Sequence, residues 1–331
     1  MQFRNALRQF RNALQKIVKV LATNSLSRKW LNTLYQRLTF AQMRFFHRNF
    51  AKIFRDEHRQ VEPGHWRVNF AGQQILLPLS SERFWLDWDI AVSILGQDVE
   101  IKETYASLIN SSEPPEIFVD IGANYGIHSL PFLTHQIETI AFEPNTSCHD
   151  YLREVCALNA MKLRIEDVAL GDRDSYVELW YPEKDAWLGS TDISVKQKLE
   201  AKHNLTTRRV RQKTLDEYLT DIGNRRLLIK IDAEGSEYRI LQGALCTLQK
   251  NRPLVLFESR RDDNNRCELF DLFSSQNYGV AHLPWFQDQP TPLLNLPEFL
   301  NSAATNFIAV PAKHNEDASG NQPNGAYLPT T

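Results

Sequence analysis

Short apolar runs alternate with helical patterns through the last two thirds of the chain. Alternation of this kind predicts a mainly parallel sheet that is covered by helices on both faces, and therefore an α/β fold. A separate strand with alternating polarity is predicted at 175–181, whereas residues 182–207 are polar and read as irregular. The strands expected in the sheet are 117–121, 138–142, 163–170, 227–232, 253–258, 278–283 and 306–310, and the helices 147–159, 236–248 and 267–275.

The pattern is different before residue 113. Apolar residues recur at spacings of four and three from Phe3 to Leu21, which predicts one amphipathic helix with Arg and Lys on its other surface. A second basic helical stretch covers about 29–55, a hairpin is expected at 66–79, and helices at 84–95 and 99–108. The predicted organisation is a basic helical extension (1–60), a hairpin and helical cap (61–112), the main domain (113–312) and a disordered tail (313–331).

Charge is distributed unevenly along the chain. The net charge is −2, yet residues 1–60 hold 13 Lys and Arg against only Asp56 and Glu57. An apolar stripe beside a basic face is typical of an interfacial membrane helix, while a coiled-coil arm or a helix packed on its own domain shows the same pattern. The acidic remainder argues against a nucleic-acid partner. Four cysteines without a CxxC pair, no signal peptide and no apolar run of about 20 residues together favour a cytoplasmic protein, peripheral to the membrane if the helix binds it.

The stretch after the first sheet strand carries the clearest binding signal. Asp120 ends the strand, and Gly122 and Gly126 form a turn through which a ligand can approach the backbone closely. Asn124 replaces the central glycine of a dinucleotide fingerprint, and no Walker lysine follows. Asp120 would repel a pyrophosphate but suits an ammonium group, and Glu143 at the next strand end can accept both hydroxyls of a ribose. S-adenosylmethionine has these parts.

Five motifs occur in a fixed order and resemble the FkbM-type family of S-adenosylmethionine-dependent methyltransferases. They are Val119-Asp-Ile-Gly-Ala-Asn-Tyr-Gly126, Phe142-Glu-Pro144, Ala169-Leu-Gly-Asp172, Lys230-Ile-Asp-Ala-Glu-Gly-Ser-Glu237 and Leu256-Phe-Glu258. The resemblance covers roughly 115–260 and implies a Rossmann-like class I methyltransferase sheet. It also implies roles for single residues: Asp120, Gly122, Asn124 and Gly126 at the methionine end of the cofactor, Glu143 on the ribose, and Asp167 with the Val168 backbone beside adenine.

Acidic residues follow the fourth and fifth sheet strands. Asp232 and Glu234 are expected beside the transferable methyl, where a carboxylate can act as general base or where clustered acids can bind Mg²⁺. Glu234 and Glu237 also fit the cap of the helix that follows, and Glu237 fits either this cluster or that cap. Ser190, Thr191 and Glu258 are the candidate acceptor-binding residues. His128 is a candidate base or a helix-packing residue, and His149 is expected on the surface of its helix.

These observations predict a methyltransferase, and the resemblance implies transfer to oxygen of a hydroxylated small molecule, sugar or glycan. Two other functions remain open. A nicotinamide-dependent Rossmann oxidoreductase is disfavoured by Asp120 and Asn124, and a non-catalytic protein recruited to an anionic membrane through residues 1–25 is disfavoured by the intact acidic rim. The sequence leaves the acceptor, metal dependence and oligomeric state undetermined.

Overall fold

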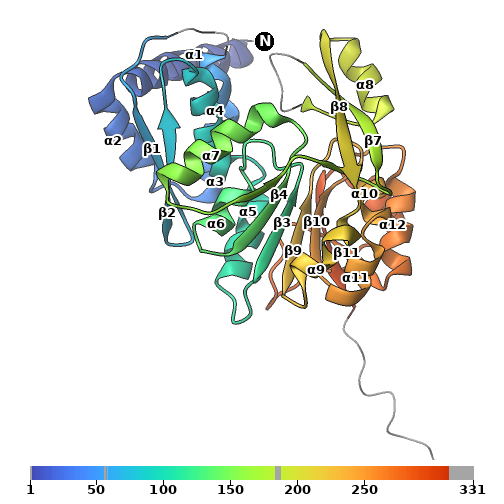
Figure 1. The fold of residues 1–331 in the computed structure, drawn as a ribbon. Helices are drawn as coiled ribbons and strands as arrows, with labels where there is room; N and C mark the ends of the chain where they lie inside the picture. The colour runs from blue at the N-terminus through green and yellow to red at the C-terminus, as the bar shows by residue number, and fades with distance from the viewer. Residues whose placement is uncertain (1, 56, 58, 183–187, 313–331) are drawn as a thin grey trace, which may run out of the picture.

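The computed structural model describes residues 2–55, 57, 59–182 and 188–312. A seven-stranded sheet lies at its centre in the order β11-β12-β10-β9-β3-β4-β5, with β12 alone antiparallel to its neighbours (Figure 1). A mainly parallel sheet of this kind with helices between its strands is Rossmann-like, so the predicted α/β fold class is confirmed. The strands are β3 (Ile117–Ile121), β4 (Glu138–Phe142), β5 (Arg164–Glu166), β9 (Leu227–Ile231), β10 (Leu254–Glu258), β11 (Tyr278–His282) and β12 (Asn306–Pro311).

The order of the strands reverses between β3 and β9. From β3 the chain moves outward through β4 to β5, then returns to β9 on the other side of β3. In open α/β sheets, ligands bind outside the carboxyl ends of the strands at such a reversal. All five residues of β3 and all five of β9 are buried, which is why both read as apolar runs interrupted only by Asp120 and Lys230.

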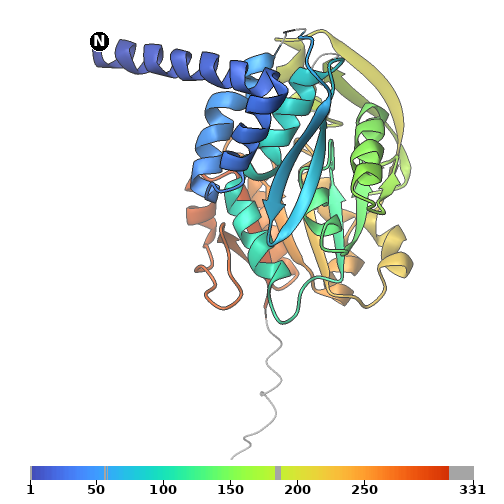
Figure 2. The same cartoon turned by 90° about the vertical axis from the view of Figure 1, so that its left-hand side faces the viewer.

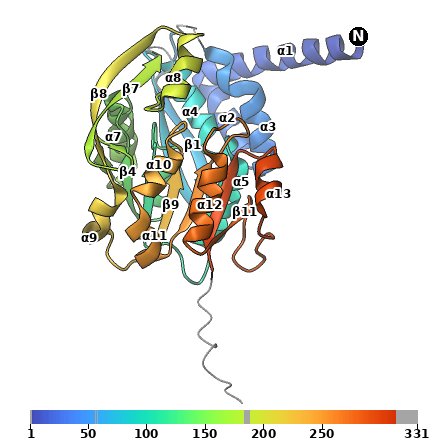
Figure 3. The same cartoon turned by 90° about the vertical axis from the view of Figure 1, so that its right-hand side faces the viewer.

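Helices cover both faces of this sheet. One face, which includes Phe118 and Leu228, shares a core with the N-terminal elements, while the other, which includes Val119 and Ile229, packs against helices from the second half of the chain (Figure 3). The first group of helices is α4 (Phe84–Gly96), α5 (Val99–Ile109), α6 (Ser129–Leu133), η2 (Thr146–Cys148) and α7 (His149–Leu158). The second is η4 (Leu215–Tyr218), α9 (Leu219–Ile222), α10 (Glu237–Gln242), α11 (Leu245–Asn251), α12 (Arg266–Ser275) and α13 (Leu296–Asn301).

The N-terminal region forms helices and one hairpin. These elements are α1 (Gln2–Thr23), α2 (Ser25–Tyr35), α3 (Phe40–Phe50), η1 (Ala51–Phe54), β1 (Gly64–Phe70) and β2 (Gln73–Leu79). Trp66 packs edge-on against Trp88 with ring centroids 5.1 Å apart, which ties the hairpin to α4. The amide of Asn159, after α7, both donates to and accepts from the backbone of Leu76 at 2.8 Å. The start of α1 projects away from this packed body (Figure 2).

A small third sheet corrects part of the sequence interpretation. The single strand predicted at 163–170 is divided: β5 joins the large sheet, whereas β6 (Ala169–Leu170) pairs with β8 (Leu205–Lys213), which also pairs with β7 (Ser175–Pro182). Residues 182–207 are not wholly irregular, because α8 (Ile193–Glu200) begins at Asp192, whose carboxylate accepts the backbone N–H groups of Ser194 and Val195. None of its residues is buried, so the helix has no apolar stripe for the sequence to show.

The predicted helix at 236–248 is two helices, α10 and α11. Gly243 lies between them in close contact with the carbonyl oxygen of Gly171, and a Cβ there would lie only 2.0 Å from that oxygen. Along the described parts of the chain, no helix combines the length and apolarity needed to cross a membrane. The predicted tail at 313–331 lies outside the described residues, and the predicted domain boundaries stay predictions.

Candidate functional site

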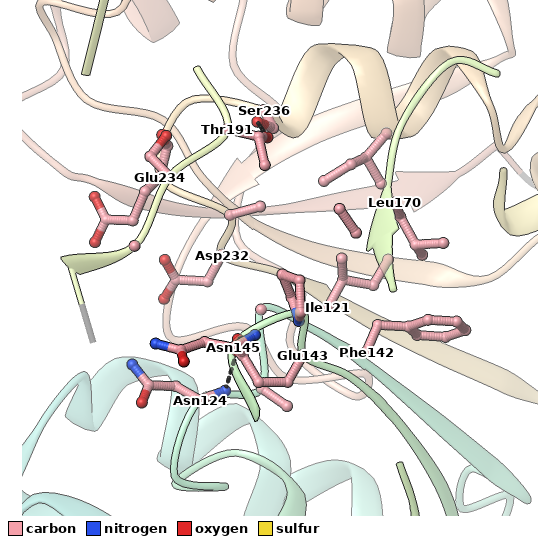
Figure 4. Close-up of a pocket in the computed structure, with 18 of the residues that line it drawn as sticks. Ile121, Asn124, Phe142, Glu143, Asn145, Leu170, Thr191, Asp232, Glu234 and Ser236 are labelled. Atoms are coloured by element: carbon pink, nitrogen blue, oxygen red, sulfur yellow. Dashed lines mark hydrogen bonds between the residues drawn. The ribbon is translucent and has the colours of Figure 1, made fainter. Parts of the chain in front are cut away.

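A cavity opens at the carboxyl ends of β3, β4 and β9, where the strand order reverses (Figure 4). Eight of the residues predicted from the sequence line it: Gly122, Asn124, Glu143, Val168, Ser190, Thr191, Asp232 and Glu234. The other four, Asp120, Gly126, Asp167 and Glu258, stand around it and are outside the lining of this cavity in the described structure.

The turn after β3 is built by two left-handed residues. Gly122 has φ +78° and lies so close to the neighbouring strand end that a Cβ would meet the Asp232 carbonyl oxygen at 1.9 Å. Asn124 has φ +50°, a conformation that Asn tolerates better than most residues. The backbone N–H groups of Gly122 and Ala123 both donate to the Phe142 carbonyl, at 3.0 and 3.2 Å. The turn therefore holds the ends of β3, β4 and β9 together.

Glu143 is fixed by the turn that it faces. Its two carboxylate oxygens accept the backbone N–H groups of Asn124 at 2.8 Å and Asn145 at 2.7 Å (Figure 4). The side chain is buried, and burial raises its pKa to about 7, with smaller upward contributions from Asp120 and Asp167. His149, expected on the surface, is instead 3% exposed, and its Nε2 lies 2.7 Å from the Glu143 carbonyl oxygen. That expectation is wrong because the first turn of α7 packs on the site.

Asp120 lies beneath the turn. Its Oδ2 accepts a 2.5 Å hydrogen bond from the Ser129 hydroxyl, and its Oδ1 has no hydrogen-bond partner among the described residues. Burial raises its pKa to about 6. Gly126 has φ +80° and faces Leu152 on α7. Both residues therefore shape the turn from below in this structure, and their predicted contact with the methionine end of a cofactor stays a prediction.

Three acids gather at the rim. Carboxylate oxygens of Asp232, Glu234 and Glu258 all lie within 4.8 Å of one another. Burial raises the pKa of Glu234 and brings that of Glu258 to about 9, with further increases from the neighbouring carboxylates. Arg260 pairs with Glu234 at 2.9 Å and Glu258 at 3.0 Å, and Lys230 pairs with Asp232 at 3.4 Å. Oxygen donors suit Mg²⁺, but these cations already compensate the acids, so metal binding stays a prediction.

Glu237 caps its own loop. Its Oε1 accepts the backbone N–H groups of Ala233 at 2.9 Å and Gly235 at 3.3 Å. It lines a neighbouring cavity that it shares with Glu258. The capping interpretation of Glu237 therefore accounts for its contacts, and Glu258 stands between the two cavities.

The segment around Ser190 crosses over the loop after β9. The Ser190 hydroxyl donates to the Glu234 carbonyl at 2.7 Å, and the hydroxyls of Thr191 and Ser236 lie 2.9 Å apart. On the opposite side, Val168 lines the cavity while Asp167 is half exposed and pairs with Arg208 at 3.6 Å. The acceptor and adenine roles of these residues stay predictions.

Several lining residues were not identified from the sequence. Gln97 comes from the connection between α4 and α5, 25 positions before Gly122, and nothing in its local pattern points to a site. Leu179 and Ser236 arrive from the small sheet and from the start of α10. Asn145 follows Glu143-Pro144 directly, so its proximity to the predicted ribose acid was the one usable signal.

Comparisons with known proteins bear on this site. Residues 120–280 match a family model described as the methyltransferase FkbM domain. No curated protein sequence matches the chain.

Three solved methyltransferase structures are similar to this chain in fold. The methyltransferase FkbM of Methylobacillus flagellatus has a TM-score of 0.38 and 15% identity, over 69% of this chain and 54% of its own. The T. thermophilus 16S rRNA N2 methyltransferase, solved with AdoMet and guanosine, has a TM-score of 0.39 and 11% identity, over 77% of this chain and 52% of its own. The Pyrococcus abyssi tRNA (uracil-54, C5)-methyltransferase, solved with S-adenosyl-L-homocysteine, has a TM-score of 0.33 and 11% identity, over 74% of this chain and 43% of its own. The chain thus spans about half of the length of these proteins.

Proposed function

We propose, from the premise that residues 120–280 belong to the FkbM family of S-adenosylmethionine-dependent methyltransferases, that this chain transfers a methyl group to a hydroxyl oxygen. The acceptor class proposed is a hydroxylated small molecule, sugar or glycan. One observation carries the proposal: the turn at Gly122–Asn124 has the buried carboxylate of Glu143 on one side and the acids of Asp232 and Glu234 on the other, within one cavity.

The cofactor assignment rests on what the cavity offers. Glu143 is held by two backbone N–H groups, so its carboxylate is oriented before a ligand arrives and can accept from a ribose. Phe142, Val168 and Leu170 supply apolar surface next to it, which suits an adenine ring. The lining contains no Lys or Arg in the described residues, in keeping with a ligand that carries no phosphate. These features support S-adenosylmethionine as the cofactor.

The chemistry requires alignment and a proton acceptor. When bound, S-adenosylmethionine supplies an electrophilic methyl group on a sulfonium, and displacement proceeds in line with the C–S bond. In the proposed reaction Asp232 or Glu234 would take the proton of the acceptor O–H, while the oxygen would displace S-adenosylhomocysteine from the methyl carbon by breaking the C–S bond. Burial raises the pKa of Glu234, which brings that carboxylate closer to the range in which a general base works at neutral pH. Arg260 and Lys230 hold the two acids in place.

The test is calorimetric titration with S-adenosylhomocysteine. Glu143→Ala removes the carboxylate that accepts the ribose, and loss of hydrogen bonds to a charged group of about 1.5–3 kcal/mol each predicts a loss of at least about tenfold in affinity. Glu138→Ala is the matched control, because Glu138 begins the same strand at its far end and is exposed. Unchanged affinity of Glu143→Ala would contradict the ribose assignment. Thermal stabilisation by NAD rather than by S-adenosylhomocysteine would favour an oxidoreductase instead.

We also propose that α1 contacts an anionic membrane surface. Phe10, Ile17 and Val20 are 63%, 54% and 66% exposed, although they are large apolar side chains on one helix. Exposed basic residues, Arg8, Arg11 and Lys16, lie on the same helix. Exposed apolar side chains beside basic ones are the composition expected of a helix that lies in a lipid headgroup region. The attraction of the basic side chains to anionic lipid and the burial of the apolar side chains both contribute to the binding free energy of such a helix.

A further inference from the structure

His128 is a buried side chain that lines the cavity and has one ring nitrogen that is unpaired within the described chain. The residue is 3% exposed and is among the residues that line the cavity. Its Nε2 is fully buried and has no hydrogen-bond partner among the described residues. Since an unpaired buried polar atom is costly, such an atom beside a cavity points to a ligand group that completes it.

The other ring nitrogen of His128 is held by two groups from α5. Lys102 Nζ lies 3.0 Å from Nδ1 and also donates to the Ile127 carbonyl at 2.8 Å. The Tyr105 hydroxyl lies 3.2 Å from the same Nδ1. A charged lysine can donate but cannot accept a hydrogen bond. While Lys102 is charged, Nδ1 is therefore the accepting nitrogen, and the neutral ring carries its proton on Nε2.

This arrangement makes His128 a donor and not a base. A general base needs a lone pair on the nitrogen that faces the substrate, and here that nitrogen bears the proton. Burial and the nearby cations Lys102 and Lys230 lower the pKa of His128 well below its usual value, so the ring stays neutral. The cavity is thus offered one fixed N–H group.

The place of His128 along the cavity indicates which group it would meet. Glu143 and Val168 come from the β4 and β5 side of β3, whereas Asp232 follows β9 on the opposite side. His128 precedes α6 and Gln97 follows α4, and these two helices pack on the sheet face opposite α10. With the ribose on Glu143, the amino-acid end of the cofactor extends past the turn toward Asp232 and His128. That end carries one ammonium and one carboxylate, and a fixed N–H donor suits the carboxylate.

We propose that His128 donates its Nε2–H to the methionine carboxylate of the cofactor, and that Lys102 is the positioning residue that sets this tautomer. The proposal rests on the proposed function and adds to it a recognition element for the carboxylate. Asp232 at this end complements it, because a carboxylate suits the ammonium group. The charged and titratable groups that act on Lys102 are Asp98, Asp120, Lys230 and Asp232, together with the His128 and Tyr105 side chains in contact with it.

Two substitutions separate the two nitrogens of His128. His128→Asn keeps a polar atom near the position of Nδ1 for Lys102 but withdraws the donor from the cavity, whereas His128→Gln can place an N–H near the position of Nε2. The matched control is His135→Phe, since His135 is a half-buried histidine after α6 that bonds to the Pro131 and Ala71 carbonyls outside the cavity lining of the described chain.

The ligands are S-adenosylhomocysteine and decarboxylated S-adenosylmethionine, which keeps the ammonium but lacks the carboxylate. His128→Asn should weaken S-adenosylhomocysteine at least about tenfold while leaving the decarboxylated ligand within about threefold. His128→Gln and His135→Phe should stay within about threefold of the wild type for both. Equal losses for the two ligands, or no loss for either, would overturn the proposal. If the wild type binds S-adenosylhomocysteine but His128→Asn does not show this pattern, only the role of His128 is refuted. If the wild type binds neither ligand, the proposed function and the role of His128 are both refuted.

The positioning role of Lys102 has its own readout. Long-range ¹H–¹⁵N correlation spectra distinguish the two neutral tautomers of histidine. The wild type should show His128 with the proton on Nε2, and Lys102→Met should shift the ring toward the Nδ1–H form because the Tyr105 hydroxyl can accept. An unchanged tautomer in Lys102→Met would contradict this role, and a change in packing alone would not move the proton.

Discussion

Replacing Gly122 by alanine tests whether the turn depends on close contact between two strand ends. The new Cβ would lie 1.9 Å from the Asp232 carbonyl oxygen and 2.9 Å from its carbon, both of them backbone atoms that cannot rotate away. The hydrogen bond from the Asp232 N–H to the Ile121 carbonyl, at 3.0 Å, holds those segments together. Ordinary contact would require them to move apart by about 1.5 Å, in a region as densely packed as a crystal.

The expected cost has two parts. A left-handed alanine costs about 1 kcal/mol relative to glycine, and overpacking of this kind adds about 1–3 kcal/mol. Gly72→Ala separates them, because Gly72 has a similar φ of +87° and a Cβ there would meet nothing within 4 Å. Gly72→Ala should therefore lower the free energy of unfolding by about 1 kcal/mol, and Gly122→Ala by about 2–4 kcal/mol.

Denaturant unfolding and calorimetric titration with S-adenosylhomocysteine measure both consequences. Gly72→Ala should keep the wild-type affinity, since the hairpin turn lies far from the cavity in the sequence and outside its lining. Gly122→Ala should lose more than about tenfold, because displacement of Asp232 by more than about 1 Å exceeds what hydrogen-bond geometry tolerates. If both variants unfold alike and bind alike, the close approach is not a structural requirement of the site and the reasoning is refuted.

The affinity for S-adenosylhomocysteine should have a bell-shaped pH dependence near pH 7. Burial raises the pKa of Glu143 to about 7, so its accepting carboxylate forms as pH rises and gives the acidic limb. Burial lowers the pKa of Lys102 to about 7, so its charge is lost as pH rises and gives the alkaline limb. Calorimetry of Lys102→Met should show the acidic limb alone, and an alkaline limb that persists in this variant would exclude Lys102 as its cause. Full-length protein should sediment with anionic liposomes and not with neutral ones, and a Phe10→Ser, Ile17→Ser variant should remain in the supernatant. Substitution is preferable to deletion of 1–25 because Val18 and Ala22 are buried in the core, and binding that survives it would show that the apolar face is not the contact.

Local chemistry determined much of the fold and of the cofactor end of the site. The apolar runs of β3 and β9 are buried on both faces, so their composition alone identifies central parallel strands. Gly122 and Asn124 occupy left-handed positions for which their residue types are suited, and Glu143 follows its strand directly. Signals of this kind lie within a few neighbouring residues, so the sequence displays them.

Only the tertiary structure showed the contacts between segments that lie far apart in the sequence. Residues 163–170 look like one strand, yet β5 pairs with β4 in the large sheet while β6 pairs with β8, some 40 positions later, in the small one. The sequence shows Asp120 as an acid beside the turn, and only the tertiary structure shows that the Ser129 hydroxyl donates a hydrogen bond to its carboxylate.

His128 shows the division most clearly. The sequence placed it after the glycine turn and could not distinguish a base from a packing residue. Its proton position depends on Lys102 and Tyr105, more than 20 positions away on α5, and no local pattern encodes that contact. The sequence by itself determined the central strands β3 and β9, the turn that follows β3 and the acid that follows β4, because these depend on neighbouring residues. Which polar groups face the cavity, and with which proton, was decided only when distant segments packed together and buried them.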